Sequence, residues 1–361
     1  MTSALVPASA SAAIERCDRA SLVFDLETIA STVRRVAELA HAHGIRVLFA
    51  AKSFPHPAVR AVAAQHLDGF DVASPAELVD CAALAQMISI ADPSGAAIAT
   101  AGGTRGRLIV SCDTVEHVRA APAHAAIAIR LSASLTGRDP AIGSVLEGNG
   151  HHRSRFGLDV DPARRRAAVG ELVRAAAGRP IGVHVHHGPI IAASAERFVA
   201  TAQAALAAVD VAPAFLNLGG AWHGIADLGA AFATVRAAVP ADIELVIEPG
   251  RLFAAGAGFA VGRVTVARAL DDRELRGLDL SRICHLRWSP IELVARAPAP
   301  GEGRAVLYTG PTCFEEDALG EWTVAPAVAA ESRAVFRGVT GYALAWNVGF
   351  AGVRPADVVV A

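Results

Sequence analysis

Lysine is almost absent from this sequence. Of the 33 basic residues, Lys52 is the only lysine and all the others are arginine. A primary amine can be kept partly neutral by desolvation and can form a Schiff base with a carbonyl, which a guanidinium cannot do. Lys52 ends the apolar run Val47–Ala51, which reads as a buried strand. Two interpretations are open: an imine-forming amine, or a lysine that survived a drift to arginine and extends into water.

Strong charge, long apolar runs and paired cysteines are also lacking. The 361 residues are 19% charged with a net charge of −2, and the longest basic run is Arg164–Arg166. The sequence therefore has no extended basic face of the kind that would bind nucleic acid or an anionic membrane surface. Apolar stretches break before 18 residues, and Met1–Ala13 lacks the basic start of a secretory signal. The five cysteines form no CxxC pair, which favours reduced thiols and a cytoplasmic location.

Apolar runs alternate with helical segments in the first part of the chain. This alternation predicts an α/β fold class with a (β/α)8 TIM-like barrel. The predicted strands are Arg46–Lys52, Gly69–Ser74, Ile88–Asp92, Leu108–Cys112, Ala126–Leu131, Ile181–His187, Phe215–Gly219 and Ile243–Glu248. Periodicity between the strands predicts helices such as Leu26–His43, Pro75–Gln86, Pro162–Ala177 and Ala192–Val209.

After Arg251 the pattern changes to short strands divided by turn residues, with little helix. The predicted strands here are Phe259–Ala269, Ile283–Trp288, Arg304–Thr309, Trp322–Ala325 and Ala343–Val348. Ser21–Leu26 is a candidate strand that joins them. We therefore expect a barrel over residues 27–250 and a β-rich domain made of residues 1–26 and 251–361.

Residues suited to chemistry stand near the ends of the predicted barrel strands, where the active sites of such barrels lie. They are Lys52, Asp71, Arg130, His186, Gly219, Gly220 and Glu248. Pyridoxal phosphate needs an imine-forming lysine, a group against its ring, a partner for its pyridine nitrogen and a phosphate cradle. Lys52, His186 and Glu248 match the first three needs, and the glycines with Gly250–Arg251 match the fourth.

Seven motifs follow one another in the order seen in fold-type III pyridoxal-phosphate-dependent decarboxylases, which include ornithine and diaminopimelate decarboxylases. They are Ala51–Pro55, Gly69–Leu78, His186–Gly188, Gly219–Gly220, Glu248–Arg251, Gly310–Cys313 and Gly341–Tyr342. The sequence resembles this family from about Ser21 to its C-terminus. The resemblance implies an alanine racemase-like fold, in which the barrel is followed by a β-rich C-terminal domain.

The resemblance also implies a role for each matched residue. Lys52 would carry the cofactor as an imine, His186 would stack on its ring, and Glu248 would pair with the pyridine nitrogen. Gly219, Gly220, Gly250, Arg251 and Tyr342 would surround the phosphate. We add Asp71 and Arg130 to the cofactor site because of their places in the predicted barrel strands. Cys313 and Asp317 would reach into the partner subunit's site of an obligate homodimer. There the Cys313 thiol would protonate the carbanion left by CO₂ loss.

Several positions depart from the family pattern. Pro189 replaces the usual serine and Ala221 replaces the third glycine of the usual triple. Phe314 replaces the acid that commonly contacts the distal amine of the substrate, and Glu315 follows it. We therefore expect an atypical or conjugated amino acid, such as an intermediate of siderophore or antibiotic biosynthesis, contacted by Phe314, Glu315 and Asp317. Ornithine, lysine, arginine and diaminopimelate stay open as alternatives.

Two other functions also stay open. One is a non-catalytic protein that binds pyridoxal phosphate but has lost turnover. The other is a barrel metallohydrolase that uses His184, His186 and His187, because His-x-His is a known metal spacing. Against the second stands Glu248–Arg251, where metallohydrolases usually need an aspartate. The preferred interpretation is a decarboxylase of an α-amino acid, with no metal and with neither nucleic acid nor membrane as partner.

Overall fold

The computed structural model describes residues 6–136, 154–158, 161–186, 194–295 and 298–361. The chain divides into two compact units. The barrel unit comprises Thr32–Lys52 and Arg60–Leu252, and the sheet unit comprises Met1–Ser31, Ser53–Val59 and Phe253–Ala361. Lys52 is the last residue of its segment of the barrel unit.

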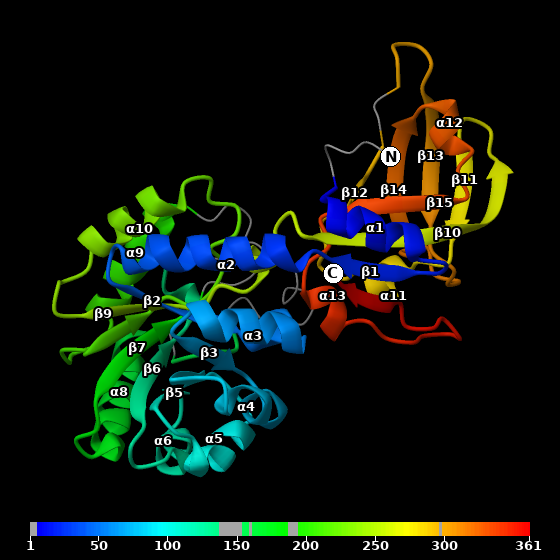
Figure 1. Ribbon diagram of the computed structural model, residues 1–361. Helices are drawn as coiled ribbons and strands as arrows, with labels where there is room; N and C mark the ends of the chain where they lie inside the picture. The colour runs from blue at the N-terminus through cyan, green and yellow to red at the C-terminus, as the bar shows by residue number, and fades with distance from the viewer. Residues whose placement is uncertain (1–5, 137–153, 159–160, 187–193, 296–297) are drawn as a thin grey trace. The chain divides into compact units, whose positions relative to one another are not determined.

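Eight parallel strands close the barrel in sequence order, from β2 to β9, and β9 pairs with β2 (Figure 1). They are β2 (Ile45–Ala50), β3 (Gly69–Val72), β4 (Met87–Ile90), β5 (Arg107–Cys112), β6 (Ala126–Leu131), β7 (Ile181–Val185), β8 (Phe215–Asn217) and β9 (Glu244–Ile247). The predicted (β/α)8 barrel is confirmed, and each predicted strand overlaps an observed one. The observed strands often end sooner, so that their last predicted residues belong to the loops where chemistry is expected.

Helices connect the strands, and side-chain caps fix where several of them begin. They are α2 (Leu26–His41), α3 (Pro57–His66), α4 (Pro75–Ala82), α5 (Ala96–Thr100), α6 (Val115–Ala120), α8 (Pro162–Ala176), α9 (Ala195–Ala207) and α10 (Leu228–Ala237). Ser74, Asp161 and Ser194 each accept a backbone N–H in the first turn of the helix that follows. Over the residues described, no helix has both the length and the apolar character needed to cross a membrane.

Apolar side chains fill the barrel beneath its polar end. One buried cluster joins residues from six of the strands: Leu48, Met87, Ile109, Ala126, Ala128, Phe215 and Val246. Gly182 gives the Phe215 ring its space, because a Cβ at position 182 would lie 2.3 Å from that ring. The interior is therefore a packed core that supports the site above it.

The sheet unit contains eight strands, of which six follow the order β12-β15-β10-β11-β13-β14. The strands are β1 (Ser21–Phe24), β10 (Gly258–Ala269), β11 (Glu274–Leu278), β12 (Glu292–Leu293), β13 (Arg304–Thr309), β14 (Ala318–Val324), β15 (Arg333–Arg337) and β16 (Asp357–Val360). β1 pairs with β10 and β16, which confirms that the early strand joins this part of the chain. Its short helices are α1 (Ala8–Arg16), α11 (Arg282–His285), α12 (Pro326–Ala329) and α13 (Tyr342–Ala345).

Two strand predictions in this unit are wrong. Ile283–Trp288 overlaps α11 and Ala343–Val348 overlaps α13. Ser281 caps α11 through the N–H of Cys284, and the Asp317 carboxylate accepts the N–H groups of Arg282 and Ile283. Short apolar runs have no decisive period of their own. At Arg282–His285 the helix start is stabilised by the carboxylate of Asp317, which is distant in the sequence.

Candidate active site

Six buried polar side chains form a layer at the C-terminal end of the barrel. They are Asp71, Ser89, Ser111, His184, Asn217 and Glu248, none more than 3% exposed. Strand register aligns Asp71 with Ser89 and His184 with Asn217 on neighbouring strands. Because burying unpaired polar groups costs free energy, a layer of this kind in an apolar barrel indicates a site.

Lys52 and Asp71 meet at this end of the barrel. Lys52 lies in a 3-10 turn, Ala51–Ser53, directly after β2, and its Nζ is 2.6 Å from Oδ2 of Asp71. Asp71 is fully buried, whereas the Lys52 side chain is 36% exposed. Burial, followed by the charge of Glu248, raises the pKa of Asp71 to about 7, although Lys52 and Arg130 oppose the shift. Asp71 can therefore take up or release a proton near neutral pH beside the Lys52 amine.

Glu248 follows β9 and is held on one side only. Its Oε1 accepts hydrogen bonds from Ser89 Oγ at 3.0 Å and from Asn217 Nδ2 at 2.5 Å. Its Oε2 is buried and has no hydrogen-bond partner among the described residues, and the same holds for Oδ1 of Asp71. Buried polar atoms in proteins normally have a hydrogen-bond partner. Two buried carboxylate oxygens without one therefore indicate that a bound ligand supplies hydrogen-bond donors at this site.

His186 lies against two glycines. A Cβ at Gly219 would lie 2.7 Å from the His186 ring, and a Cβ at Gly220 would lie 3.2 Å from its Nε2. Gly219 also has a φ of +63°, which favours glycine. The structure thus brings His186 and the Gly219–Gly220 loop together, and any side chain at either glycine would displace the imidazole.

The loop continues through Ala221, which adopts a φ of +70° without being glycine. The next residue, Trp222, anchors the loop: its Nε1 donates to the carbonyl of Gly219 at 3.0 Å. Its indole stacks on Phe198 of α9 with ring centroids 3.7 Å apart. This anchoring stabilises a left-handed alanine that would otherwise cost free energy.

Arg130 and Arg251 supply cations at the same end of the barrel unit. The guanidinium of Arg130 lies over the Phe156 ring, 4.8 Å from the ring centroid. The backbone carbonyl of Arg130 accepts the N–H of Leu158. Burial lowers the pKa of Arg130, and the charges of Asp113, Glu248 and Asp71 oppose that shift. Arg251 follows Gly250, and its positive charge, together with the larger effect of burial, lowers the pKa of His223.

The remaining predicted site residues belong to the sheet unit. Cys313 is an exposed free thiol, and Phe314, Glu315 and Glu316 are exposed beside it. The Phe314 ring lies 5.3 Å from that of Phe350. Tyr342 begins α13 and packs edge-on against Trp288.

Asp317 is placed differently from its neighbours. It is 2% exposed, and its Oδ1 accepts from Ser281 Oγ and from the N–H groups of Arg282 and Ile283. Its Oδ2 accepts the N–H of Thr312 at 3.1 Å. Both oxygens of Asp317 thus accept hydrogen bonds from its own unit. This arrangement favours a structural role for Asp317 over the substrate contact expected from the sequence.

Some predicted positions lie outside the described residues, namely His187 and Pro189. Within the described ranges, no three histidine, cysteine, aspartate or glutamate side chains are arranged to hold a metal ion. His184 instead directs its Nδ1 to Ser111 Oγ at 2.6 Å.

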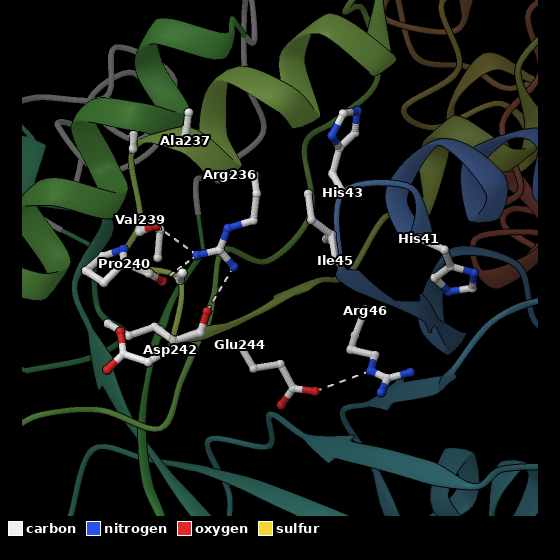
Figure 2. Close-up of a pocket in the computed structure, with 14 residues that line it drawn as sticks. His41, His43, Ile45, Arg46, Arg236, Ala237, Val239, Pro240, Asp242 and Glu244 are labelled. Atoms are coloured by element: carbon white, nitrogen blue, oxygen red, sulfur yellow. Dashed lines mark hydrogen bonds and ion pairs between the residues drawn. The ribbon is translucent and has the colours of Figure 1, made fainter.

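A hollow of about 1140 Å³ lies at the other end of the barrel, where β2 and β9 begin at Ile45 and Glu244 (Figure 2). Both of its arginines have partners: Arg46 contacts Glu244, and Arg236 donates to the carbonyls of Val239, Pro240 and Ile243. Chemistry in barrels of this class belongs to the opposite end, so this hollow is not a candidate active site.

Sequence reasoning gave no role in this layer to Ser89, Asn217 and His184, which lie next to Glu248, or to Ser111, which contacts His184. Their signal was present, because each is a polar side chain within an otherwise apolar strand. Identifying their partners required the register between strands, which no single strand contains.

The described residues fit pyridoxal phosphate. The unused Oε2 of Glu248 is an acceptor suited to a protonated ring nitrogen, and Lys52 offers the amine. The absence of side chains at Gly219 and Gly220, beside His186, would allow a phosphate to approach the backbone closely, and Arg251 supplies a cation.

Comparison with known proteins agrees with this fit. The pyridoxal binding domain of the pyridoxal-dependent decarboxylases matches residues 26–255. No curated protein matches the sequence.

Solved structures share the whole fold at low sequence identity. Lysine/ornithine decarboxylase from Vibrio vulnificus, complexed with cadaverine, is 18% identical with a TM-score of 0.77, covering 97% of both chains. Arginine decarboxylase from Paramecium bursaria Chlorella virus is 16% identical with a TM-score of 0.77, covering 97% of this chain and 98% of the other. Diaminopimelate decarboxylase from M. jannaschii, with L-lysine, is 18% identical with a TM-score of 0.75, covering 95% and 88%.

Proposed function

This chain belongs to the family of pyridoxal-dependent decarboxylases, and from that premise we propose that it removes the α-carboxylate of an atypical or conjugated amino acid. Its cofactor is pyridoxal phosphate, as the match over residues 26–255 shows and as the sequence motifs predicted. The main support for this reaction is the Lys52–Asp71 pair at the same end of the barrel as Glu248, which is buried and has one oxygen without a hydrogen-bond partner in the described residues.

In this proposal the barrel unit binds the cofactor. Lys52 is the point of covalent attachment, His186 contacts the ring face, and Glu248 pairs with the ring nitrogen. The cofactor's phosphate would be held by Gly219, Gly220, Gly250 and Arg251. Tyr342, which the family resemblance adds to this set, belongs to the sheet unit. When bound, pyridoxal phosphate supplies an electron sink for the electron pair left by CO₂.

The protein's own groups then manage protons. Asp71, with a pKa raised to about 7 chiefly by burial, holds or accepts a proton at Lys52 Nζ. Glu248, fixed by Ser89 and Asn217, presents its free oxygen to the ring nitrogen. Arg130 balances the two carboxylates, since its charge lowers the pKa of Asp71.

The substrate assignment rests on Phe314. An aromatic ring that packs near Phe350 offers no charge partner for a terminal ammonium group. We infer a substrate with a bulky or uncharged distal portion, consistent with a conjugated intermediate of siderophore or other specialised metabolism. Ornithine, lysine, arginine or diaminopimelate remain the competing substrates, through the exposed Glu315.

The decisive experiment is a screen of amino acids for CO₂ release by the holoenzyme. We expect the four basic or diamino acids to react poorly, and amino acids with an acylated distal amine to react faster. Phe314→Asp should shift the preference toward lysine and ornithine, with Phe314→Leu as the matched control that keeps an apolar side chain. Efficient wild-type turnover of a simple diamino acid would overturn the substrate assignment.

Lys52 provides a direct test of the catalytic assignment. Lys52→Ala should lose the absorbance of the lysine-bound cofactor and reduce turnover by about a thousandfold or more. Lys52→Arg is a matched control, because it keeps a cation near Asp71 but cannot form the bond to the cofactor. Zero CO₂ release by wild type with every amino acid, despite lysine-bound cofactor, would instead favour the non-catalytic alternative.

We also propose a homodimer in which Cys313 serves the partner subunit's site and donates the proton that replaces CO₂. Lys52→Ala and Cys313→Ala enzymes should each be impaired, and mixing them should create hybrids with one intact site. Random exchange makes about half of the dimers hybrid, so roughly a quarter of the sites should recover. No recovery despite proven exchange would place Cys313 in the site of its own chain.

A further inference from the structure

His184 is a buried histidine to which the proposed roles assign nothing. It is 1% exposed and lies on β7 between Ser111 of β5 and Glu248. Its Nδ1 is 2.6 Å from Ser111 Oγ, and its Nε2 is 3.6 Å from Glu248 Oε2. Neither Nε2 nor Oε2 has a hydrogen-bond partner in the described part of the chain. Two unused atoms of complementary type thus face each other in the interior.

The contact with Ser111 selects the tautomer of His184. If the hydroxyl donates to Nδ1, the single proton of a neutral imidazole lies on Nε2, which faces Glu248. The other tautomer would direct an Nε2 lone pair at a buried carboxylate oxygen, which is unfavourable away from water. The arrangement therefore favours an N–H donor aimed at Oε2.

The ring adds this donor without adding charge. Burial, followed by the positive charges of Arg130 and Lys52, holds the pKa of His184 well below its usual value. The charged groups around the pair are Lys52, Asp71, Arg130 and Glu248. Arg130 and Lys52 already bring positive charge close to the ring, so a neutral donor fits the site better than a third cation.

We propose that His184, oriented by Ser111, is a positioning residue that fixes Glu248 for its contact with the cofactor's ring nitrogen. A side-chain shift of roughly half an ångström brings Nε2 and Oε2 within hydrogen-bond distance. With Ser89 and Asn217 on Oε1 and His184 on Oε2, the carboxylate cannot rotate. Its orientation toward the ring nitrogen would then be fixed. This inference rests on the proposed function, because it acts through Glu248.

A series of variants at position 184 tests the donor. His184→Asn places its amide at the level of Nδ1 and removes the donor to Glu248, whereas His184→Gln reaches the position of Nε2. We expect His184→Asn to lower kcat by roughly ten- to a hundredfold with little change in KM. It should also shift the pH dependence of the bound cofactor's absorbance. His184→Gln should restore both, and equal defects in the two variants would contradict a positioning role.

His285 supplies the matched control. It is also a fully buried histidine, but it lies in the sheet unit, where Nδ1 accepts the N–H of Ser281 and Nε2 contacts the carbonyl of Arg354. His285→Asn should lower stability while leaving the absorbance titration unchanged. If His184→Asn behaves in the same way, His184 is structural only.

A measurement on the cofactor-free protein separates this inference from the proposed function. Nitrogen NMR of labelled histidine should find the His184 proton on Nε2, and Ser111→Ala should allow the other tautomer to appear. A proton on Nδ1 in the wild type would overturn the inference, whatever the enzyme does. Absence of CO₂ release with the expected tautomer would instead overturn the proposed function alone.

Discussion

The barrel unit and the sheet unit each bury carboxylates, and they treat them in opposite ways. Asp317 of the sheet unit accepts hydrogen bonds at both oxygens, three of them from backbone N–H groups. Asp71 and Glu248 of the barrel unit each keep one buried oxygen without a partner in the described residues. A satisfied carboxylate holds a fold together, whereas an unsatisfied one is maintained at a cost that a ligand can repay. The contrast predicts a structural role for Asp317 and a functional role for Asp71 and Glu248, without reference to the family.

The sharpest test of this contrast is Glu248→Gln. The variant should still bind the cofactor but lose about 10²- to 10³-fold in turnover, because a neutral amide cannot stabilise a protonated ring nitrogen. Its unfolding midpoint should change less than that of Asp317→Asn, because the amide oxygen can still accept from Ser89 and Asn217. Single-turnover CO₂ release and thermal unfolding measure the two effects, and activity within about twofold of wild type would remove Glu248 from the mechanism.

The reverse outcome is expected at Asp317. Asp317→Asn should lower the free energy of unfolding by about 2 kcal/mol, because one carboxylate oxygen becomes an amide that cannot accept a hydrogen bond. The affinity of the barrel for the cofactor should stay unchanged. Denaturant unfolding and cofactor titration report the two quantities. Full stability with lost turnover would restore the substrate contact inferred from the sequence.

Asp71 is expected to make the free energy of unfolding depend on pH. Its pKa is raised from the ordinary 3.8 to about 7, mainly by burial, so the folded protein keeps a proton that the unfolded chain releases between these values. The stability that Asp71 contributes is complete below about pH 4 and is lost as the pH rises to about 7. The slope should not exceed about 1.4 kcal/mol per pH unit.

Unfolding of cofactor-free wild type and of Asp71→Asn across this range compares the proteins with and without the Asp71 carboxyl, because groups far from Asp71 titrate equally in both. The amide should flatten the dependence. Parallel curves for the two proteins would mean that the Lys52 ion pair outweighs burial and keeps Asp71 ionised throughout.

The smallest effect is expected at Ala221. Ala221→Gly should stabilise the barrel unit by about 0.5 to 1 kcal/mol, because glycine adopts a φ of +70° without strain. Ala177→Gly, at a φ of +52° in the C-cap of α8, is the matched control for strain relief away from the site. Both should raise the unfolding midpoint, and only Ala221→Gly should alter cofactor affinity. A lower midpoint for Ala221→Gly would show that Ala221 is not strained.

The barrel was predictable because its strands are long enough to be recognised and recur with helices between them. The polar strand ends Lys52, Asp71 and Glu248 could be picked out for the same reason. The helix at Arg282–His285 could not, since its start depends on Asp317, which is far away in the sequence. Likewise, the partners of Glu248 come from β4, β7 and β8, and only the closed barrel brings them together.

Trp222 gives the glycine loop an optical reporter of its own. The other three tryptophans, Trp288, Trp322 and Trp346, all belong to the sheet unit, whereas Trp222 is 1% exposed and hydrogen-bonded to Gly219. Replacing those three with phenylalanine would leave a single emitter in the barrel unit. Its fluorescence would be quenched by energy transfer when an absorbing cofactor binds near Gly219. Loading of the site could then be followed in real time without any substrate.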